Sequence, residues 1–128
     1  MHNIGIALME KGYHVTGSDD EIFEPSLSRL RKYGLIADEY GWNEKNISPD
    51  VDIVILGMHA RADNIELKKA QQLGLKIFSF PEFIYEQSKN KKRVVIGGSH
   101  GKTTITAMIL HVFKNLNSDF DYMAGAAI

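Results

Sequence analysis

The most constraining feature of this sequence is a glycine-rich turn that joins a short apolar run to an amphipathic helix near the C-terminal end. Residues 93–97 read Arg-Val-Val-Ile-Gly, a pattern typical of a β-strand, and the turn continues as Gly-Ser-His-Gly-Lys-Thr-Thr to Thr104. Apolar residues then recur at helical spacing, which predicts a helix with one continuous buried stripe. The stripe consists of Ile105, Met108, Ile109, Val112, Phe113 and Leu116.

This order of strand, glycine turn, lysine and helix suits the binding of nucleotide phosphates. Glycines at positions 97, 98 and 101 let backbone N–H groups converge on an anion without clashes from Cβ atoms. The unpaired N–H groups of the helix's first turn add to that positive field. Lys102 can reach terminal phosphate oxygens, and the Thr103 hydroxyl is placed to ligate Mg²⁺.

The usual phosphate-loop pattern is not matched strictly. It places four residues between its first glycine and the Gly-Lys pair, which would require glycine where Ile96 stands. Counted from Gly97, three residues precede Gly101. The alternative is an accidental glycine-rich turn with a surface lysine. The doubled glycine and the Lys-Thr-Thr run favour phosphate binding over it.

Strand-like and helical segments alternate along the rest of the chain. Strands are predicted at residues 13–18, 52–57 and 76–80, and the second has both faces apolar, as in a parallel sheet covered on two sides. Helices are predicted over residues 1–11, from Pro25 to Gly34, over residues 64–73 with Asp63 as N-cap and Leu67 and Ala70 facing inward, and from Pro81 to Ser88. This alternation predicts an α/β fold of βαβ units around a parallel sheet.

The polar segment 87–92 is the best candidate for a linker, and it divides the chain into predicted domains at residues 1–91 and 92–128. A solvated helix end followed by a tight turn is the alternative for this segment. The first domain opens on a helix, although a doubly wound domain normally opens with a strand and a glycine turn. We therefore expect that the chain starts inside a domain or lacks upstream residues.

Composition narrows the class of protein. The net charge of −1 over 128 residues gives no electrostatic argument for a nucleic acid or an anionic membrane as partner. The absence of cysteine excludes disulfides, thiolate metal sites and cysteine nucleophiles. No apolar run approaches the ~18 residues that span a bilayer. Together these features fit a globular cytoplasmic protein.

Gly98-Ser-His-Gly-Lys-Thr-Thr104 resembles the Gly-Thr-(Asn/His)-Gly-Lys-Thr-Thr loop of the Mur ligases, ATP-dependent amide-forming enzymes of peptidoglycan precursor synthesis. Ser99 in place of the threonine is a mild departure. Residues 1–8 and 12–19 are similar to the first helix and second strand of that family's UDP-sugar-binding domain. Asp63-Asn64 resembles the Asp-Asn-Pro-Glu segment of the subgroup that accepts UDP-N-acetylmuramate, with Ile65 replacing the proline.

The resemblance implies a Rossmann-like, parallel-sheet UDP-binding domain at residues 1–91. The first strand, phosphate loop and helix of a P-loop ATPase domain would follow at residues 92–128. The family's first glycine turn would lie upstream of Met1, and its magnesium-binding glutamate and modified lysine would lie downstream of Ile128. By this resemblance, the 128-residue piece would not catalyse the ligase reaction by itself.

The resemblance also implies a reaction and its participants. The carboxylate of UDP-N-acetylmuramate would be activated by ATP as an acyl phosphate and joined to the amino group of L-alanine, either free or leading a peptide. Mg²⁺ would assist, with Thr103 as a ligand, and Lys102 would be the catalytic residue that neutralises charge on the γ-phosphoryl group. The implied ATP phosphate site comprises Gly98, Ser99, His100, Gly101, Lys102, Thr103 and Thr104.

Individual residues of these sites carry alternatives. Thr104 also suits packing or capping of the helix, and His100 suits loop-shaping hydrogen bonds as well as nucleotide contact. Candidates for the UDP-substrate site are Ser18, Asp19, His59 and Asn64. Asp19 ends a predicted strand where doubly wound folds hold a ribose or base, but it equally suits capping of the next turn beside Asp20. His59 follows a buried strand, and a plain exposed loop histidine is its alternative.

Two rival functions compete with this interpretation. A folate polyglutamate synthase would share the ligase chemistry, but the segments that resemble a UDP-sugar domain speak against it. A non-catalytic nucleotide- or dinucleotide-binding module is the rival from another class, and it would have no need of the Gly-Lys-Thr lysine.

Overall fold

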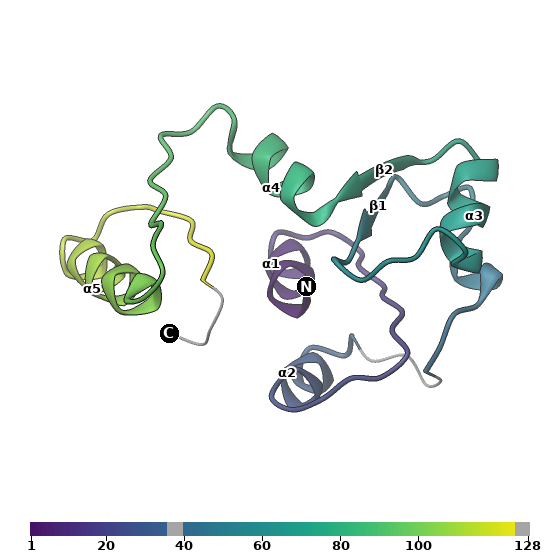
Figure 1. The fold of residues 1–128 in the computed structure, drawn as a ribbon, viewed down its shortest axis with the longest axis horizontal. Coiled ribbons are helices and arrows are strands. Elements are labelled where there is room, and N and C mark those ends of the chain that lie inside the picture. Colours follow the sequence, from purple (N-terminus) through teal and green to yellow (C-terminus); the bar gives the residue numbers. More distant parts are fainter. Residues whose placement is uncertain (36–39, 125–128) are drawn as a thin grey trace. The chain divides into compact units, whose positions relative to one another are not determined.

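The computed structural model of the chain describes residues 1–35 and 40–124. The chain divides into two compact units, Met1–Lys89 and Asn90–Ile128, and each is described by itself (Figure 1). Within the described ranges, no helix has the length and apolar character needed to cross a membrane.

The first unit contains a two-stranded parallel sheet. β1 (Ile53–Leu56) pairs with β2 (Lys76–Ser79), and Ile53 lies opposite Lys76 at the start of the register. α3 (Ile65–Gln72) connects the two strands, so residues 53–79 form a βαβ unit (Figure 1). The predictions of strands at residues 52–57 and 76–80 and of a helix between them are therefore confirmed, and the chain is α/β with a small parallel sheet.

The remaining helices follow the predicted order. In the first unit they are α1 (His2–Glu10), α2 (Ser26–Lys32), the short 3₁₀ helix η1 (Glu44–Asn46) and α4 (Phe80–Ser88), and in the second unit α5 (Lys102–Asn115). α1 packs against α2, and η1 packs against α3. Pro25 is the N-cap residue of α2 and lies just outside its first turn.

α4 and the sheet share the small core of the first unit. Ala70 of α3 and Phe83 of α4 are buried, and the rings of Phe78 and Phe83 meet edge to face with centroids 6.0 Å apart. Leu67, the other residue predicted to face inward on α3, is half-buried. The cover predicted on both faces of β1 is incomplete, since Ile53 at its start is 39% exposed and residues 54–56 are half-buried.

Two predicted strands are wrong. Residues 13–18 and 93–97 form no strand, and no backbone ladder joins either segment to another among the described residues. Both segments have the composition of a strand, but a strand exists only where a neighbour accepts and donates its backbone hydrogen bonds. Within the described parts of the chain the sheet has only the two members β1 and β2.

The predicted buried stripe of α5 is also wrong in one respect. The helix forms where its periodicity predicts it, yet none of its residues is buried. Met108 and Val112 are 64% and 53% exposed, and they line a shallow apolar hollow with Ile109 and Phe113. The described part of the second unit contains no sheet for this face to cover.

Candidate functional site

The glycine turn at residues 98–101 contains two glycines with a positive φ. Gly98 has a φ of +146° and Gly101, the N-cap of α5, has a φ of +76°. Residues with a Cβ rarely adopt either conformation, so glycine is required at both positions. α5 then begins at Lys102 without any side-chain cap and without an acidic residue in its first turn. The N-terminal N–H groups of the helix therefore remain available to an anion.

Lys102 folds back over this turn. Its Nζ donates hydrogen bonds to the carbonyl oxygens of Gly98 at 2.5 Å and Ser99 at 3.2 Å. The ammonium group is thus held on the turn itself, beside the helix N-terminus, instead of extending into solvent. An incoming phosphate would find a cation and free backbone N–H groups in one place.

The other predicted phosphate-site residues lie around the same turn. Ser99 and His100 occupy the exposed bend between the two glycines, and Thr103 and Thr104 lie exposed in the first turn of α5. The imidazole of His100 makes no hydrogen bond to the described residues, so the loop-shaping alternative gains no support. Residues 98–104 are thus all exposed, and their contact with phosphate stays a prediction.

A protein-only metal site is not present in the described part of the chain. No group of three or more His, Asp or Glu side chains lies close enough to hold an ion there. A hydroxyl such as that of Thr103 provides one neutral oxygen, which suits Mg²⁺ only alongside phosphate oxygens and water.

Ser18 and Asp19 lie in an irregular segment of the first unit. The Asp19 carboxylate accepts a hydrogen bond from the Asp20 backbone N–H at 2.9 Å, and its carbonyl oxygen accepts one from Gly41 N–H at 2.9 Å. Asp19 is exposed and has a local backbone partner in Asp20, and its contact with a ribose or base stays a prediction. Ser18 Oγ accepts a hydrogen bond from Asn46 Nδ2 at 3.1 Å.

His59 lies in the turn that follows β1. This turn is closed by a hydrogen bond from Ala60 N–H to the Gly57 carbonyl at 3.1 Å, and the imidazole is exposed. It therefore lies at the carboxyl end of a parallel strand, the edge at which open α/β sheets bind ligands.

Asn64, and not Asp63, is the N-cap of α3. Its Oδ1 accepts hydrogen bonds from the backbone N–H groups of Glu66 at 2.9 Å and Leu67 at 3.0 Å. Asp63 instead pairs with the Arg61 guanidinium at 3.3 Å. Asn and Asp cap helices about equally well, so sequence alone does not fix which of two neighbours does so. Because Oδ1 of Asn64 is occupied by these hydrogen bonds, the side-chain amide nitrogen is the atom that remains for contact with a ligand.

Sequence reasoning missed a polar network centred on Glu66. Glu66 as a whole residue is 8% exposed, and its Oε1 accepts hydrogen bonds from Asn43 N–H at 2.9 Å and Asn46 Nδ2 at 2.8 Å. Through Asn46 the network reaches Ser18. A signal was present, because Glu66 matches the last residue of the Asp-Asn-Pro-Glu segment that Asp63-Asn64 resembles.

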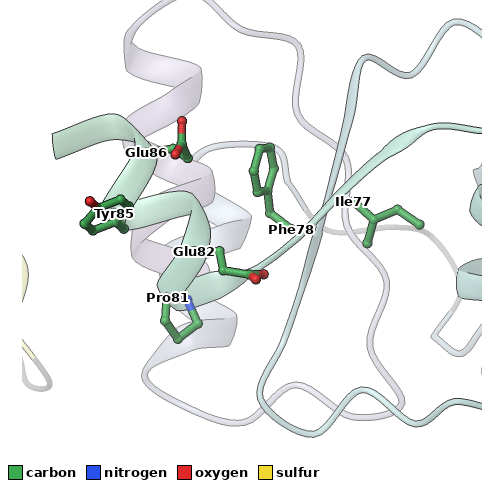
Figure 2. A pocket seen from close by; sticks show the side chains of 6 residues that line it. All are labelled: Ile77, Phe78, Pro81, Glu82, Tyr85 and Glu86. Atoms are coloured by element: carbon green, nitrogen blue, oxygen red, sulfur yellow. The ribbon is translucent and has the colours of Figure 1, made fainter. Parts of the chain in front are cut away.

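A separate shallow pocket of about 480 Å³ lies where α4 follows β2 (Figure 2). Figure 2 shows the side chains that line it: Ile77, Phe78, Pro81, Glu82, Tyr85 and Glu86. No residue predicted for the phosphate or UDP site lies among them. The Glu82 carboxylate there closes the capping box of α4 with Ser79.

Comparisons with known proteins give one consistent result. No protein-family model matches the chain. A UDP-N-acetylmuramate–L-alanine ligase of a Sulfurihydrogenibium species is 38% identical over 128 residues, all of this chain and 28% of the relative. The protein of the same name from Clostridium acetobutylicum is 37% identical over 127 residues, 98% of this chain and 27% of the relative. The protein of the same name from Carboxydothermus hydrogenoformans is 33% identical over 119 residues, which are 93% of this chain and 25% of the relative.

The predicted resemblance to the Mur ligases is therefore confirmed along the whole chain. The chain spans between 25% and 28% of the length of these three relatives.

Proposed function

We propose that this chain supplies the UDP-sugar-binding and ATP-phosphate-binding residues of an ATP-dependent peptidoglycan ligase. The ligase would join the carboxylate of UDP-N-acetylmuramate to the amino group of L-alanine, either free or leading a peptide. The observation that carries the proposal is the turn at residues 98–101, with Lys102 hydrogen-bonded to it at the start of α5. The names of the relatives support the choice of reaction.

In this proposal, residues 1–91 form a Rossmann-like UDP-binding domain and residues 92–128 open a P-loop ATPase domain. The β1–α3–β2 unit supports the first assignment, since it is the repeating element of such folds. The left-handed Gly101 at the N-terminus of α5 supports the second.

Lys102 would act directly on the transferred phosphoryl group. Its ammonium exchanges the carbonyl oxygens of Gly98 and Ser99 for phosphate oxygens, which carry full negative charge and are stronger acceptors. The backbone N–H groups of residues 98–104 hold the other phosphate oxygens. Phosphoryl transfer is catalysed mainly by positioning and charge neutralisation, and this arrangement offers both.

The chemistry needs ATP because a carboxylate is a poor electrophile. A carboxylate oxygen of UDP-N-acetylmuramate attacks the γ-phosphorus and ADP leaves, which converts that oxygen into a good leaving group. The L-alanine amine then attacks the carbonyl carbon of the acyl phosphate. The nitrogen loses a proton, inorganic phosphate leaves, and an amide remains.

Mg²⁺ would be held in part by the Thr103 hydroxyl, which lies one residue after Lys102 and is exposed. Its chemistry there is the neutralisation of charge on the phosphate oxygens. The described residues offer no set of carboxylates for it, so the phosphates and water would supply most other ligands from this side of the site.

The UDP-sugar would bind along the edge formed by Ser18, Asp19, His59 and Asn64. Ser18 and Asp19 are neighbours in the chain, and the Asp19 carbonyl accepts a hydrogen bond from Gly41 N–H. His59 follows β1, and Asn64 is the N-cap of α3. These residues provide a hydroxyl, a carboxylate oxygen, an imidazole and an amide nitrogen, which suit a ribose, a base and a diphosphate.

Calorimetry tests directly which class of ligand binds. It uses the full-length gene product that contains this chain, which we call the intact protein. We expect UDP-N-acetylmuramate to bind, and NAD and folate to give no heat beyond dilution. Binding of NAD alone would replace the proposal with a dinucleotide-binding module, and binding of folate would point to a folate polyglutamate synthase. Turnover with L-alanine compared with an L-alanyl tripeptide then identifies the acceptor.

A further inference from the structure

The starting observation is the buried carboxylate of Glu66. It is the only charged or polar side chain that is buried in the described parts of the chain, and no basic side chain there pairs with it. Burial of an unpaired carboxylate is costly unless hydrogen bonds compensate for the lost water. Here both compensating bonds end on one oxygen, Oε1, which accepts from Asn43 N–H and Asn46 Nδ2.

The network fixes the orientation of the Asn46 amide. One Nδ2 hydrogen is donated to Glu66 Oε1 at 2.8 Å and the other to Ser18 Oγ at 3.1 Å. Both amide hydrogens are therefore used within the protein. The amide oxygen, Oδ1, has no hydrogen-bond partner among the described residues and stays an acceptor for something else.

The same network fixes what Ser18 can offer. A hydroxyl oxygen that already accepts the Asn46 hydrogen bond can still donate its own hydrogen. Ser18 is half-buried and Asn46 is exposed, so a ligand can reach both. Side by side, the pair presents one acceptor, Asn46 Oδ1, and one donor, the Ser18 hydroxyl.

We propose that Glu66 is a positioning residue that orients Asn46 and Ser18 to recognise the imide edge of uracil. This inference rests on the proposed function, in which a uridine nucleotide binds beside Ser18. Uracil offers an N3–H donor for Asn46 Oδ1 and its C4 carbonyl oxygen as an acceptor for the Ser18 hydroxyl, which is the position where cytosine carries its amino group. Cytosine offers a bare N3 and an amino donor, so both of its groups would meet the wrong partner.

The alternative role for Glu66 is to fasten η1 to α3 without any effect on the ligand. That role predicts changes in stability alone. Orientation of Asn46 also predicts a change in the preference between uracil and cytosine, which a purely structural tie would not alter.

The test is the ratio of dissociation constants for UDP and CDP, measured by calorimetry on the intact protein. We expect the wild type to prefer UDP by at least about tenfold, because a mismatched base leaves polar groups unpaired. Glu66→Ala should reduce the ratio to less than about threefold, since the Asn46 amide can then rotate. Glu66→Gln should restore it, because its amide oxygen can accept both hydrogen bonds.

Controls separate this inference from loss of folding and from failure of the proposed function. Glu86→Ala removes a carboxylate that pairs with Lys89 outside the network and should leave the ratio unchanged. If Glu66→Ala fails to fold, Asn46→Ala removes an exposed side chain and should lower the ratio in the same way. A wild type that does not bind UDP overturns the proposed function. A folded Glu66→Ala or Asn46→Ala protein that keeps the wild-type ratio overturns only the role of Glu66, as does a Glu66→Gln protein that loses the ratio.

Discussion

Lys102 connects the sequence to the proposed chemistry at the scale of a single residue. Its ammonium is bound to the carbonyl oxygens of Gly98 and Ser99, the two residues at the start of the predicted phosphate site. These neutral acceptors are weaker than phosphate oxygens, so the contact can be exchanged when a nucleotide binds. The position of the ammonium is thus set before the ligand arrives.

We expect Lys102→Ala to lower turnover of the intact enzyme by at least about a hundredfold, because the transferred phosphoryl group loses its main source of positive charge. Steady-state ADP release measures the effect. Lys92→Ala, which removes an exposed lysine ahead of the turn, is the matched control and should remain within about twofold of the wild type. Wild-type turnover of Lys102→Ala would remove the role assigned to this residue.

Thr103→Val should raise the Mg²⁺ concentration needed for half-maximal activity by about tenfold or more, a scale typical of lost interactions around a metal. The substitution keeps the shape of the side chain and removes only the hydroxyl. Thr106→Val is the control, because the Thr106 hydroxyl donates to the Lys102 carbonyl at 2.8 Å inside α5 and faces no phosphate in our proposal. Equal Mg²⁺ requirements in the two variants would exclude Thr103 as a ligand.

The local structure of the proposed phosphate site follows from the sequence because the residues that determine it are neighbours in the chain. Gly98, Gly101 and Lys102 lie within one turn, and their order alone specifies a backbone that only glycine adopts and a cation next to a helix N-terminus. The Glu66 network could not be predicted in this way. It joins residues 18, 43, 46 and 66, which are brought together only by the packing of η1 against α3.

At the scale of the element, the predictions succeed for helices and for strands that have a partner. α4 shows the local case. Ser79 accepts a hydrogen bond from Glu82 N–H at 3.4 Å, and the Glu82 carboxylate accepts from Ser79 N–H at 2.8 Å and from the Ser79 hydroxyl at 2.6 Å. This capping box and Pro81 start the helix where the sequence predicts it.

Ser79→Ala should destabilise the protein by about 1 kcal/mol, the usual cost of losing an N-cap side chain. Thermal or urea unfolding measures this change. Ser88→Ala is the control, since the Ser88 hydroxyl donates to the Ile84 carbonyl within α4 and caps no N–H group. Equal stability of the Ser79→Ala variant and the wild type would contradict the importance of the box.

The same box makes a prediction about pH. The pKa of Glu82 lies below its ordinary value of 4.5, first because of the Ser79 hydroxyl and then because of the Ser79 backbone N–H. A lowered pKa in the folded state means that the stabilisation is complete above pH 4.5 and is lost as the pH falls through the lowered value. In Ser79→Ala the pKa of Glu82 should rise toward 4.5, as an NMR titration of its side chain would measure. An unchanged pKa would assign the shift to another cause.

The failed predictions at this scale concern contacts with other elements. Residues 13–18 and 93–97 have strand composition but pair with no strand in the described parts of the chain. The apolar face of α5 has no sheet to cover in the described part of its unit, although the Phe120 ring lies 5.6 Å from that of Phe113. Local pattern predicts that an element can form and which face is apolar. It does not supply the partner that turns an extended segment into a strand or an apolar face into a core.

At the scale of the whole molecule, the chain consists of two units, and the two predicted sites fall one in each. Ser18, Asp19, His59, Asn64 and the Glu66 network belong to the unit Met1–Lys89, and residues 98–104 belong to the unit Asn90–Ile128. The matched relatives are three to four times longer than this chain, since it spans 25% to 28% of their length. Catalysis therefore has to be tested on the intact protein.

Two separate units predict separable binding. In the intact protein, Lys102→Ala should leave the dissociation constant of UDP-N-acetylmuramate within about twofold of the wild-type value, because the hydrogen-bond partners of the Lys102 ammonium are Gly98 and Ser99 and not the predicted UDP-site residues. Calorimetry without ATP gives this number. A tenfold loss of UDP-N-acetylmuramate affinity in a folded variant would mean that Lys102 serves the UDP-sugar site.

The central claim is that ATP held at residues 98–104 activates the muramyl carboxylate as an acyl phosphate. The most direct measurement starts from UDP-N-acetylmuramate with ¹⁸O in its carboxylate and supplies ATP and L-alanine or the L-alanyl tripeptide to the intact protein. We predict that one labelled oxygen is transferred to the inorganic phosphate formed with each amide bond, which mass spectrometry detects. Amide formation with unlabelled phosphate would contradict this account.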